Sequence, residues 1–386
     1  MSTPTQHAVA ADWVFDGATV RRGAAVVIEG PRIAAVVPRT ELPATLPLRS
    51  LPDGAWLAPG FIDVQVNGGG DVLFNDIPTA AGIRAIAAAH RRFGTTALLP
   101  TLISDAPEKT ERALAAVEEL AGTEPSIIGI HLEGPFLSPE RPGVHDLRHI
   151  RPPTAEDGAM LTAPRQGVTV VTLAPERVPN GFIRQLAGAG IRICLGHSMA
   201  TYAETRAAMV DGLTGFTHLF NAMRPLASRE PGPIAAALES PGAWFGMIAD
   251  GAHVDPAMLR LALRGAARPM LVTDAMPPVG GSRSTFALYG EDITVHAGRC
   301  TRKDGTLAGA ALDMATAVRN CVRLLGVPLD VALRFASVHP AGFIGLDHWL
   351  GRLAPGYRAD IVAIDPITAE VLETWIAGRD GASAVS

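Results

Sequence analysis

The sequence predicts a parallel (β/α)8 barrel of the TIM type, with a small β-sandwich domain formed by the N- and C-terminal segments. Three observations support this. Between residues 58 and 345, eight short apolar runs alternate with Ala-rich helical stretches. Both ends of the chain instead contain short apolar runs separated by turn residues, which is typical of strands. The length of 386 residues and a hydrophobic content of 48% are sufficient for a large core and a small appendage.

The terminal segments are predicted to be strands because short apolar runs follow one another without a helical pattern. AAVVIEG at 24–30 and RIAAVVP at 32–38 are typical of strands, and Asp16-Gly17 supplies turn residues between them and the start of the chain. The segment 351–378 has the same pattern of short apolar runs. We therefore expect both ends to pair into one small domain. The expected segments are 1–57 (small β domain, first part), 58–345 (catalytic barrel) and 346–386 (small β domain, second part).

The barrel strands are predicted from apolar or β-branched runs of three to six residues that are bounded by turn residues. Their number, and the span of about 220 residues over which they occur, fit an eight-stranded barrel with intervening helices. The eight predicted strands are Phe61–Val66, Thr95–Leu99, Ile127–His131, Val168–Leu173, Ile191–Leu195, Gly215–Thr217, Trp244–Ile248 and Pro269–Thr273.

Helical spacing of apolar residues predicts a helix at 79–93, and residues 201–211 open with a Thr-x-x-Glu capping box. The segment 285–300 is typical of a hairpin inserted after the eighth strand. Helices are expected at 312–325 and near 330–337.

Composition excludes several classes of function. The formal net charge of −5 is mild, and no basic run favours nucleic acid or a membrane surface. The three cysteines are odd in number and far apart, which favours a reducing compartment over a disulfide framework. The first residues lack the pattern of a signal peptide, and no apolar run is long enough to span a membrane. We expect a cytoplasmic protein.

Polar residues follow the predicted strands at the end of the barrel where barrel enzymes carry their active sites. Two histidines and a carboxylate at one barrel mouth are suitable ligands for a divalent metal ion, and three protein ligands leave a position open. The sequence therefore predicts Glu133, His197 and His218 as metal ligands. Any one of them alone would be interpreted as an ordinary polar residue near a loop; the three together favour a metal site.

Asp274 ends the eighth strand after an apolar run. We expect it to face the metal, to accept a proton from water and later to donate it to a leaving nitrogen. A bound metal ion assists because it lowers the pKa of water from about 15.7 to near 7. The alternative is a structural aspartate that accepts a hydrogen bond from a neighbouring backbone amide.

His131 lies two residues before Glu133, so in a strand it points to the same side. It is interpreted either as another ligand or as a partner that orients a ligand, and we favour the partner role. Three loop residues at the same mouth, Asn221, Arg229 and His253, either bind an anion or hydroxyl groups or are simply solvated.

Eight sequence blocks surround these positions. They are PGFIDVQVNGGG (59–70), HLEGPF (131–136), LGHS (195–198), THLFNAM (217–223), REPG (229–232), ADGAHVD (249–255), VTDAM (272–276) and GTLAGA (305–310). Together they resemble the amidohydrolase superfamily and, within it, the N-acetylglucosamine-6-phosphate deacetylase family. The resemblance covers essentially the whole chain.

The resemblance implies hydrolysis of the acetamide of N-acetyl-D-glucosamine 6-phosphate, with the same three metal ligands and with Asp274 as the acid/base. It also implies a homodimer in which Arg229 reaches the phosphate bound by the neighbouring subunit. His145 is our choice as the donor to the developing oxyanion. The implied substrate contacts are Val144, His145, Asn221, Ala222, Arg229, Asp250, Gly251, Ala252, His253, Leu307, Ala308, Gly309 and Ala310.

Gln65 and Asn67 stand where many superfamily members have His-x-His. Amide side chains are poor transition-metal ligands beside imidazole, so we expect one divalent metal ion per subunit, with these two residues as hydrogen-bonding neighbours. The ligands favour Zn2+ and also accept Fe2+, Co2+ or Mn2+. Two alternatives remain open: a deacetylase of another N-acyl hexosamine phosphate, such as N-acetylgalactosamine 6-phosphate, and a non-catalytic barrel that binds sugar phosphates.

Overall fold

The computed structural model describes residues 6–380. The chain divides into two compact units. One contains the residues up to Asp63, His90–Ala97 and the residues from Asp313 onward; the other contains Val64–Ala89 and Leu98–Leu312. The domain limits expected after residues 57 and 345 stay a prediction.

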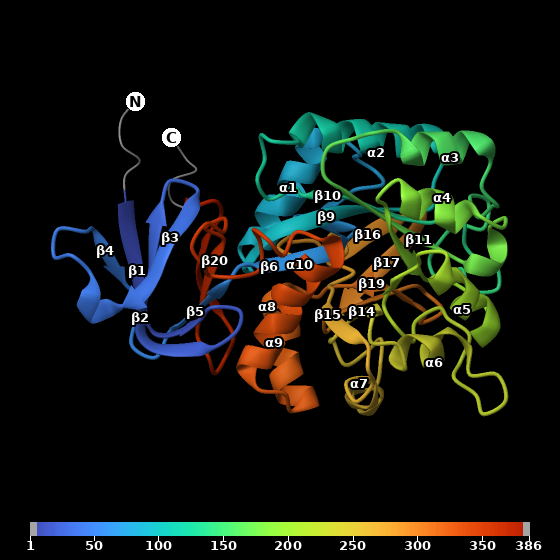
Figure 1. Ribbon diagram of the computed structural model, residues 1–386. Helices are drawn as coiled ribbons and strands as arrows, with labels where there is room; N and C mark the ends of the chain where they lie inside the picture. Colours follow the sequence, from blue (N-terminus) through green and yellow to red (C-terminus); the bar gives the residue numbers. More distant parts are fainter. Residues whose placement is uncertain (1–5, 381–386) are drawn as a thin grey trace. The chain divides into compact units, whose positions relative to one another are not determined.

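The predicted barrel is an eight-stranded parallel sheet in which the strands are neighbours in chain order, and most of its residues belong to the second unit (Figure 1). The sheet closes on itself because Val66 forms a parallel bridge with Ala275, and the Asn67 N–H donates to the Ala275 carbonyl at 2.9 Å. This confirms the (β/α)8 fold class. The strands are β6 (Phe61–Val66), β9 (Thr95–Ile103), β10 (Gly129–Glu133), β11 (Val168–Leu173), β12 (Arg192–Leu195), β13 (Gly215–Phe216), β14 (Trp244–Met247) and β15 (Arg268–Leu271).

The third barrel strand begins two residues later than the sequence predicts. Its first residue, Gly129, has φ +153°, and a Cβ there would lie 1.9 Å from the Val168 carbonyl oxygen. Only glycine allows β10 to approach β11 this closely. As a consequence, Glu133 lies within the strand rather than after it, and the parallel pairing of β10 fixes its backbone.

The helices that follow the strands lie around the outside of the ring of strands (Figure 1). The capping box predicted for α5 is confirmed: the Thr201 hydroxyl accepts from the Glu204 N–H, and the Glu204 carboxylate accepts from the Thr201 N–H at 2.7 Å. The helices are α1 (Ala80–Arg91), α2 (Pro107–Leu120), α3 (Ala155–Thr162), α4 (Phe182–Gly188), α5 (Tyr202–Val210), α6 (Gly232–Leu238) and α7 (Pro256–Ala262).

The segment after β15 forms a four-stranded antiparallel sheet, where the sequence predicts a single hairpin. Its inner face packs into a small core that includes Leu288, Ile293 and Cys300. The bridge between Ala275 and Ala310 joins its last strand to the end of the barrel sheet. The strands are β16 (Thr285–Leu288), β17 (Glu291–His296), β18 (Arg299–Thr301) and β19 (Leu307–Ala310).

In the first unit, the two ends of the chain share one sheet, as the sequence predicts. Strand β20 (Ile361–Ile364), near the C-terminus, pairs antiparallel with β5 (Trp56–Pro59) and with β21 (Val371–Trp375). Strand β5 pairs in turn with β1. The other strands of this sheet are β1 (Gln6–Phe15), β2 (Val20–Glu29), β3 (Arg32–Pro38) and β4 (Leu48–Ser50).

The remaining helical segment contains α8 (Met314–Asn320), the π-helical turn Cys321–Leu325, α9 (Leu329–Ala336) and α10 (Val338–Ile344). The three cysteines are all buried and free of disulfides. Within residues 6–380, none of the helices has the length and apolar character needed to cross a membrane.

Candidate active site

Three of the four predicted key side chains come from residues in an unusual backbone conformation. His197, His218 and Asp274 follow β12, β13 and β15 and have φ values of 48°, 31° and 50°. A non-glycine residue in this region costs about 1–3 kcal/mol, and such strain persists where the surrounding structure imposes it. Here the turn comes at the point where each strand leaves the barrel, and it directs the side chain to the mouth.

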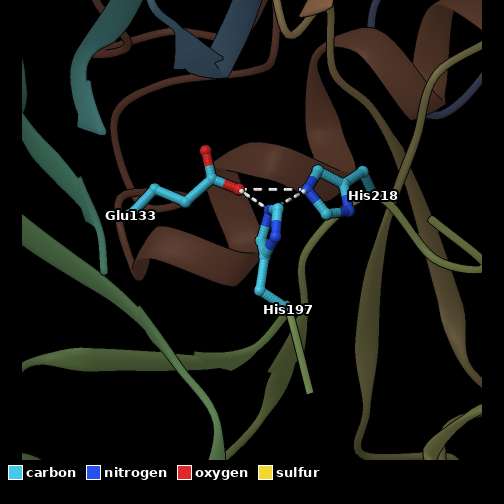
Figure 2. Close-up of side chains that lie close together, drawn as sticks. All are labelled: Glu133, His197 and His218. Carbon is cyan, nitrogen blue, oxygen red and sulfur yellow. Dashed lines mark hydrogen bonds and ion pairs between the residues drawn. The ribbon is translucent and has the colours of Figure 1, made fainter. Parts of the chain in front are cut away.

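Glu133, His197 and His218 lie together and are buried (Figure 2). The Oε1 atom of Glu133 is 3.1 Å from His197 Nε2 and 3.0 Å from His218 Nε2, and the two Nε2 atoms are 3.2 Å apart. Burial raises the pKa of Glu133, but the imidazoles of His197 and His218 beside it outweigh burial and bring the pKa well below its usual range. The carboxylate is therefore ionised.

The donor set fits a divalent cation. A tetrahedral ion with ligand bonds of 2.0–2.1 Å places its ligand atoms about 3.3 Å apart, close to the separations of these three atoms. The Nδ1–H of His197 donates to the Arg141 carbonyl at 2.9 Å, which leaves Nε2 with a lone pair for a metal ion.

A carboxylate from a neighbouring loop holds the segment that carries His197. Glu176 accepts from the Ser198 hydroxyl at 2.7 Å and from the Met199 N–H at 2.6 Å. These bonds fix the two residues that follow His197. Sequence reasoning missed Glu176, because it lies after β11 and 22 positions from Ser198.

Asp274 lies beside this group and is partly buried. Its Oδ1 accepts from Asn67 Nδ2 at 2.7 Å and from Gln65 Nε2 at 3.3 Å, and the same Gln65 amide reaches Glu133 Oε2 at 3.2 Å. Burial, together with the negative charge of Glu133, raises the pKa of Asp274 to about 6. A carboxyl with a pKa near neutrality is suited to accept and return a proton.

Both ring nitrogens of His131 have hydrogen-bond partners outside the group of proposed metal ligands. Its Nδ1–H donates to the Val64 carbonyl at 2.9 Å, and its Nε2 is 2.7 Å from the Thr172 hydroxyl. Burial lowers the pKa of His131 to about 4, so the ring is neutral. With both nitrogens occupied, it packs beneath the site as a neutral side chain and offers no lone pair to a metal ion.

His145 and His253 face the same cavity. The ring centroids of His145 and His197 are 4.4 Å apart, and burial lowers the pKa of His145 to about 3. His253 Nδ1 lies 2.7 Å from a carboxylate oxygen of Asp250, which holds the ring in place. Asp250 does not line the cavity; it binds the Nδ1 side of the His253 ring and so orients this residue.

A cavity of about 220 Å³ at the barrel mouth brings most of the predicted site together. The predicted residues that line it are Asn67, Glu133, Val144, His145, His197, His218, Asn221, Ala222, His253, Asp274, Leu307 and Gly309.

Other predicted contacts lie outside the lining of this cavity. Arg229 is exposed on a loop, and Ala308 and Ala310 are fully buried. Gly251 and Ala252 also lie outside it. The lining residues that sequence reasoning missed are Ile103, Gly143, Ile248, Met276 and Thr306. Each lies within four residues of a predicted position or at a strand end. This closeness is the sequence feature from which they could have been predicted.

A parallel barrel with a carboxylate, two imidazoles and an aspartate at its mouth defines a class of metal-dependent hydrolases. Comparison with known proteins agrees: residues 56–381 match the Amidohydrolase family. The chain belongs to this family.

Its relatives include two kinds of deacetylase. The chain is 42% identical over 326 residues to an N-acetylgalactosamine-6-phosphate deacetylase from Shewanella sp. (strain ANA-3), covering 84% of this chain and 82% of the relative. It is 34% identical over 366 residues to an N-acetylglucosamine-6-phosphate deacetylase from Haemophilus influenzae, covering 93% and 95%. The solved N-acetylglucosamine-6-phosphate deacetylase from Pasteurella multocida superimposes with a TM-score of 0.93 at 35% identity, covering 97% of this chain and 99% of that one.

Proposed function

We propose that the protein is a metal-dependent hydrolase that deacetylates N-acetyl-D-glucosamine 6-phosphate to D-glucosamine 6-phosphate and acetate. The observation that carries this proposal is the convergence of Glu133, His197, His218 and Asp274 on one cavity. The chain also shares 34–37% identity with relatives named for this activity. A protein that only binds a sugar phosphate has no need of a base beside a metal site.

Glu133, His197 and His218 are the proposed ligands of one divalent cation per chain. When bound, the cation supplies Lewis-acid polarisation of the acetyl carbonyl and lowers the pKa of water. The ligand set favours Zn2+ and also accepts Fe2+, Co2+ or Mn2+. A second tightly held ion is not expected, because the side-chain amides of Gln65 and Asn67 donate to carboxylates instead of offering imidazole lone pairs.

Asp274 is the proposed acid/base, and its two oxygens have different tasks. Oδ1 accepts from the amides of Asn67 and Gln65, so it stays unprotonated. Oδ2 is then the oxygen that takes the proton from the attacking water and passes it to the departing nitrogen as the C–N bond breaks.

His145 is the proposed donor to the oxygen of the acetyl group. The ring is neutral and buried at 4% exposure, so an N–H from it acts in a site with little water. Donors aimed at a developing oxyanion typically contribute about 2.7–4 kcal/mol to catalysis.

The phosphate needs a cation that the cavity does not supply. Its lining residues include no arginine or lysine. Arg229 is exposed and does not line the cavity of its own chain. We therefore propose a homodimer in which Arg229 of the partner subunit binds the phosphate, because guanidinium groups suit bidentate phosphate recognition.

A second substrate is favoured by a specific observation. The relative from Shewanella, at 42% identity, is named for the galactosamine epimer, and so is a 36% identical protein from Escherichia coli O157:H7. The two substrates differ only in the configuration at C4, far from the acetamide chemistry.

The test is acetate release from the two epimers by the metal-loaded protein. We expect acetate and the free amino-sugar phosphate in equal amounts, with a higher kcat/KM for the glucosamine epimer. A higher kcat/KM for the galactosamine epimer would assign the second substrate. Absence of acetate with both, despite a full complement of metal, would refute the deacetylase function.

A further inference from the structure

Ser104 lies directly behind His145. It is the first residue after β9, and it is 2% exposed. Its backbone N–H donates to His145 Nδ1 at 3.2 Å, and its hydroxyl oxygen lies 2.8 Å from the same nitrogen. Ser104 thus presents two groups to one ring atom.

These contacts determine which nitrogen of His145 carries hydrogen. A backbone N–H is always a donor, so the nitrogen that receives it must have a lone pair. Nδ1 is therefore unprotonated, and in the neutral ring the hydrogen resides on Nε2. With Nδ1 unprotonated, the Ser104 hydroxyl, 2.8 Å away, acts as a second donor to the same nitrogen.

Two neighbours favour this position of Ser104, one by a hydrogen bond and the other by leaving space. The Tyr289 hydroxyl, from the turn between β16 and β17, donates to the Ser104 carbonyl. Gly134 follows β10 with φ +85°, and a Cβ there would lie 2.2 Å from the Ser104 hydroxyl oxygen. The glycine of the HLEGPF block therefore leaves the space that the hydroxyl occupies.

We propose that Ser104 is a positioning residue that keeps His145 in the Nε2–H tautomer. This inference rests on the proposed function. Since His145 lines the cavity and Nδ1 is engaged by Ser104, Nε2–H is the donor available to the acetyl oxygen. The opposite tautomer would direct a lone pair at an oxygen that becomes negative, and would oppose the reaction.

The decisive variant is Ser104→Ala, which removes the hydroxyl and keeps the backbone donor. We expect kcat for acetate release to fall roughly 10-fold, the lower end of the effect of losing an orienting partner. KM should change by less than about twofold, since the hydroxyl does not touch substrate. Ser104→Thr restores a hydroxyl and should recover most of the loss. Ser126→Ala is the matched control, because Ser126 is buried and its hydroxyl donates to Glu124 instead.

The tautomer is read directly from 15N chemical shifts of labelled histidines, with the His145 signals assigned by their loss in His145→Gln. We expect Nε2–H in the wild-type protein and a larger Nδ1–H fraction in Ser104→Ala. Tyr289→Phe, which frees the Ser104 carbonyl without touching the ring, should move the tautomer in the same direction. Equal metal content in all variants shows that the metal site is intact.

An Nδ1–H tautomer in the wild-type protein would overturn the proposal. So would a Ser104→Ala variant with wild-type kcat and an unchanged tautomer. These results are distinct from failure of the proposed function, which would appear as no acetate release by the wild-type protein. The 15N chemical shifts give the His145 tautomer, and so test the role of Ser104, whether or not the wild-type protein releases acetate.

Discussion

At the scale of residues, the proposed chemistry depends on the different surroundings of the Glu133 and Asp274 carboxylates. Glu133 lies against the imidazoles of His197 and His218, and its pKa lies well below the usual range. Asp274 receives only amide donors and lies near the charge of Glu133, so its pKa is raised to about 6. One carboxylate is therefore suited to hold a cation, and the other to exchange a proton.

Replacing Asp274 tests this division of roles. Asp274→Asn keeps the shape and removes the base, so we expect kcat to fall about 10²- to 10⁴-fold, the range for loss of a general acid/base. Metal content and the affinity for substrate should stay close to those of the wild-type protein. Steady-state kinetics and metal analysis on one preparation check this. Near-normal turnover would rule out the role of Asp274.

The pH dependence follows from the raised pKa of Asp274. Below this pKa the carboxyl is protonated and cannot accept a proton, so kcat/KM should decrease as the pH falls. A cation at the three ligands stabilises the carboxylate, so the acid limb of the loaded enzyme should have its inflection at or below about 6. An inflection above about 7 would contradict this assignment.

The sequence identifies the candidate ligands because each stands at or near a strand end, where barrel sites are built. It does not identify Ser104 or Glu176. Ser104 reaches a residue 41 positions away and Glu176 one 22 positions away, through loops whose paths have no local sequence pattern. Such contacts exist only once the barrel is folded.

At the scale of elements, the loops after the strands determine how well the site is ordered. Glu176 holds the segment that follows β12 through two hydrogen bonds. The barrel strands themselves are predictable, since apolar runs alternate with helical patterns. The start of β10 and the four strands inserted after β15 are not, because they depend on which segments approach one another.

Glu176→Ala should weaken metal binding about 10-fold, since the backbone around His197 loses its support. Competition with a chelator measures this affinity. Glu118→Ala is a suitable control, because Glu118 accepts from the Gln166 N–H on the surface. Unchanged metal affinity in Glu176→Ala would show that the segment holds its conformation by other contacts.

At the scale of the whole molecule, membership of the Amidohydrolase family agrees with the barrel predicted from sequence. The sequence also predicts that the two ends share a sheet, which the pairing of β5 with β20 confirms. A homodimer follows from neither the fold nor the sequence pattern. Its support is the lack of a cationic side chain in the cavity lining.

Mixing two impaired variants tests the shared site. Arg229→Ala should raise KM for the phosphorylated substrate, and Asp274→Asn should lower kcat about 10²- to 10⁴-fold. If Arg229 acts on the neighbouring subunit, mixed dimers contain one site with both residues intact, and mixing the two proteins under exchange conditions restores activity. No recovery, in dimers shown to exchange subunits, would mean that Arg229 acts within its own chain or not at all.

The most direct test of the central claim is metal content and acetate release measured on one preparation, before and after treatment with a chelator. We expect one divalent cation per chain after dialysis, acetate release from N-acetyl-D-glucosamine 6-phosphate, loss of both on chelation, and recovery of both when Zn2+ is returned. Two retained cations per chain would contradict the single site. Full acetate release by the metal-free protein would contradict the role given to Glu133, His197 and His218.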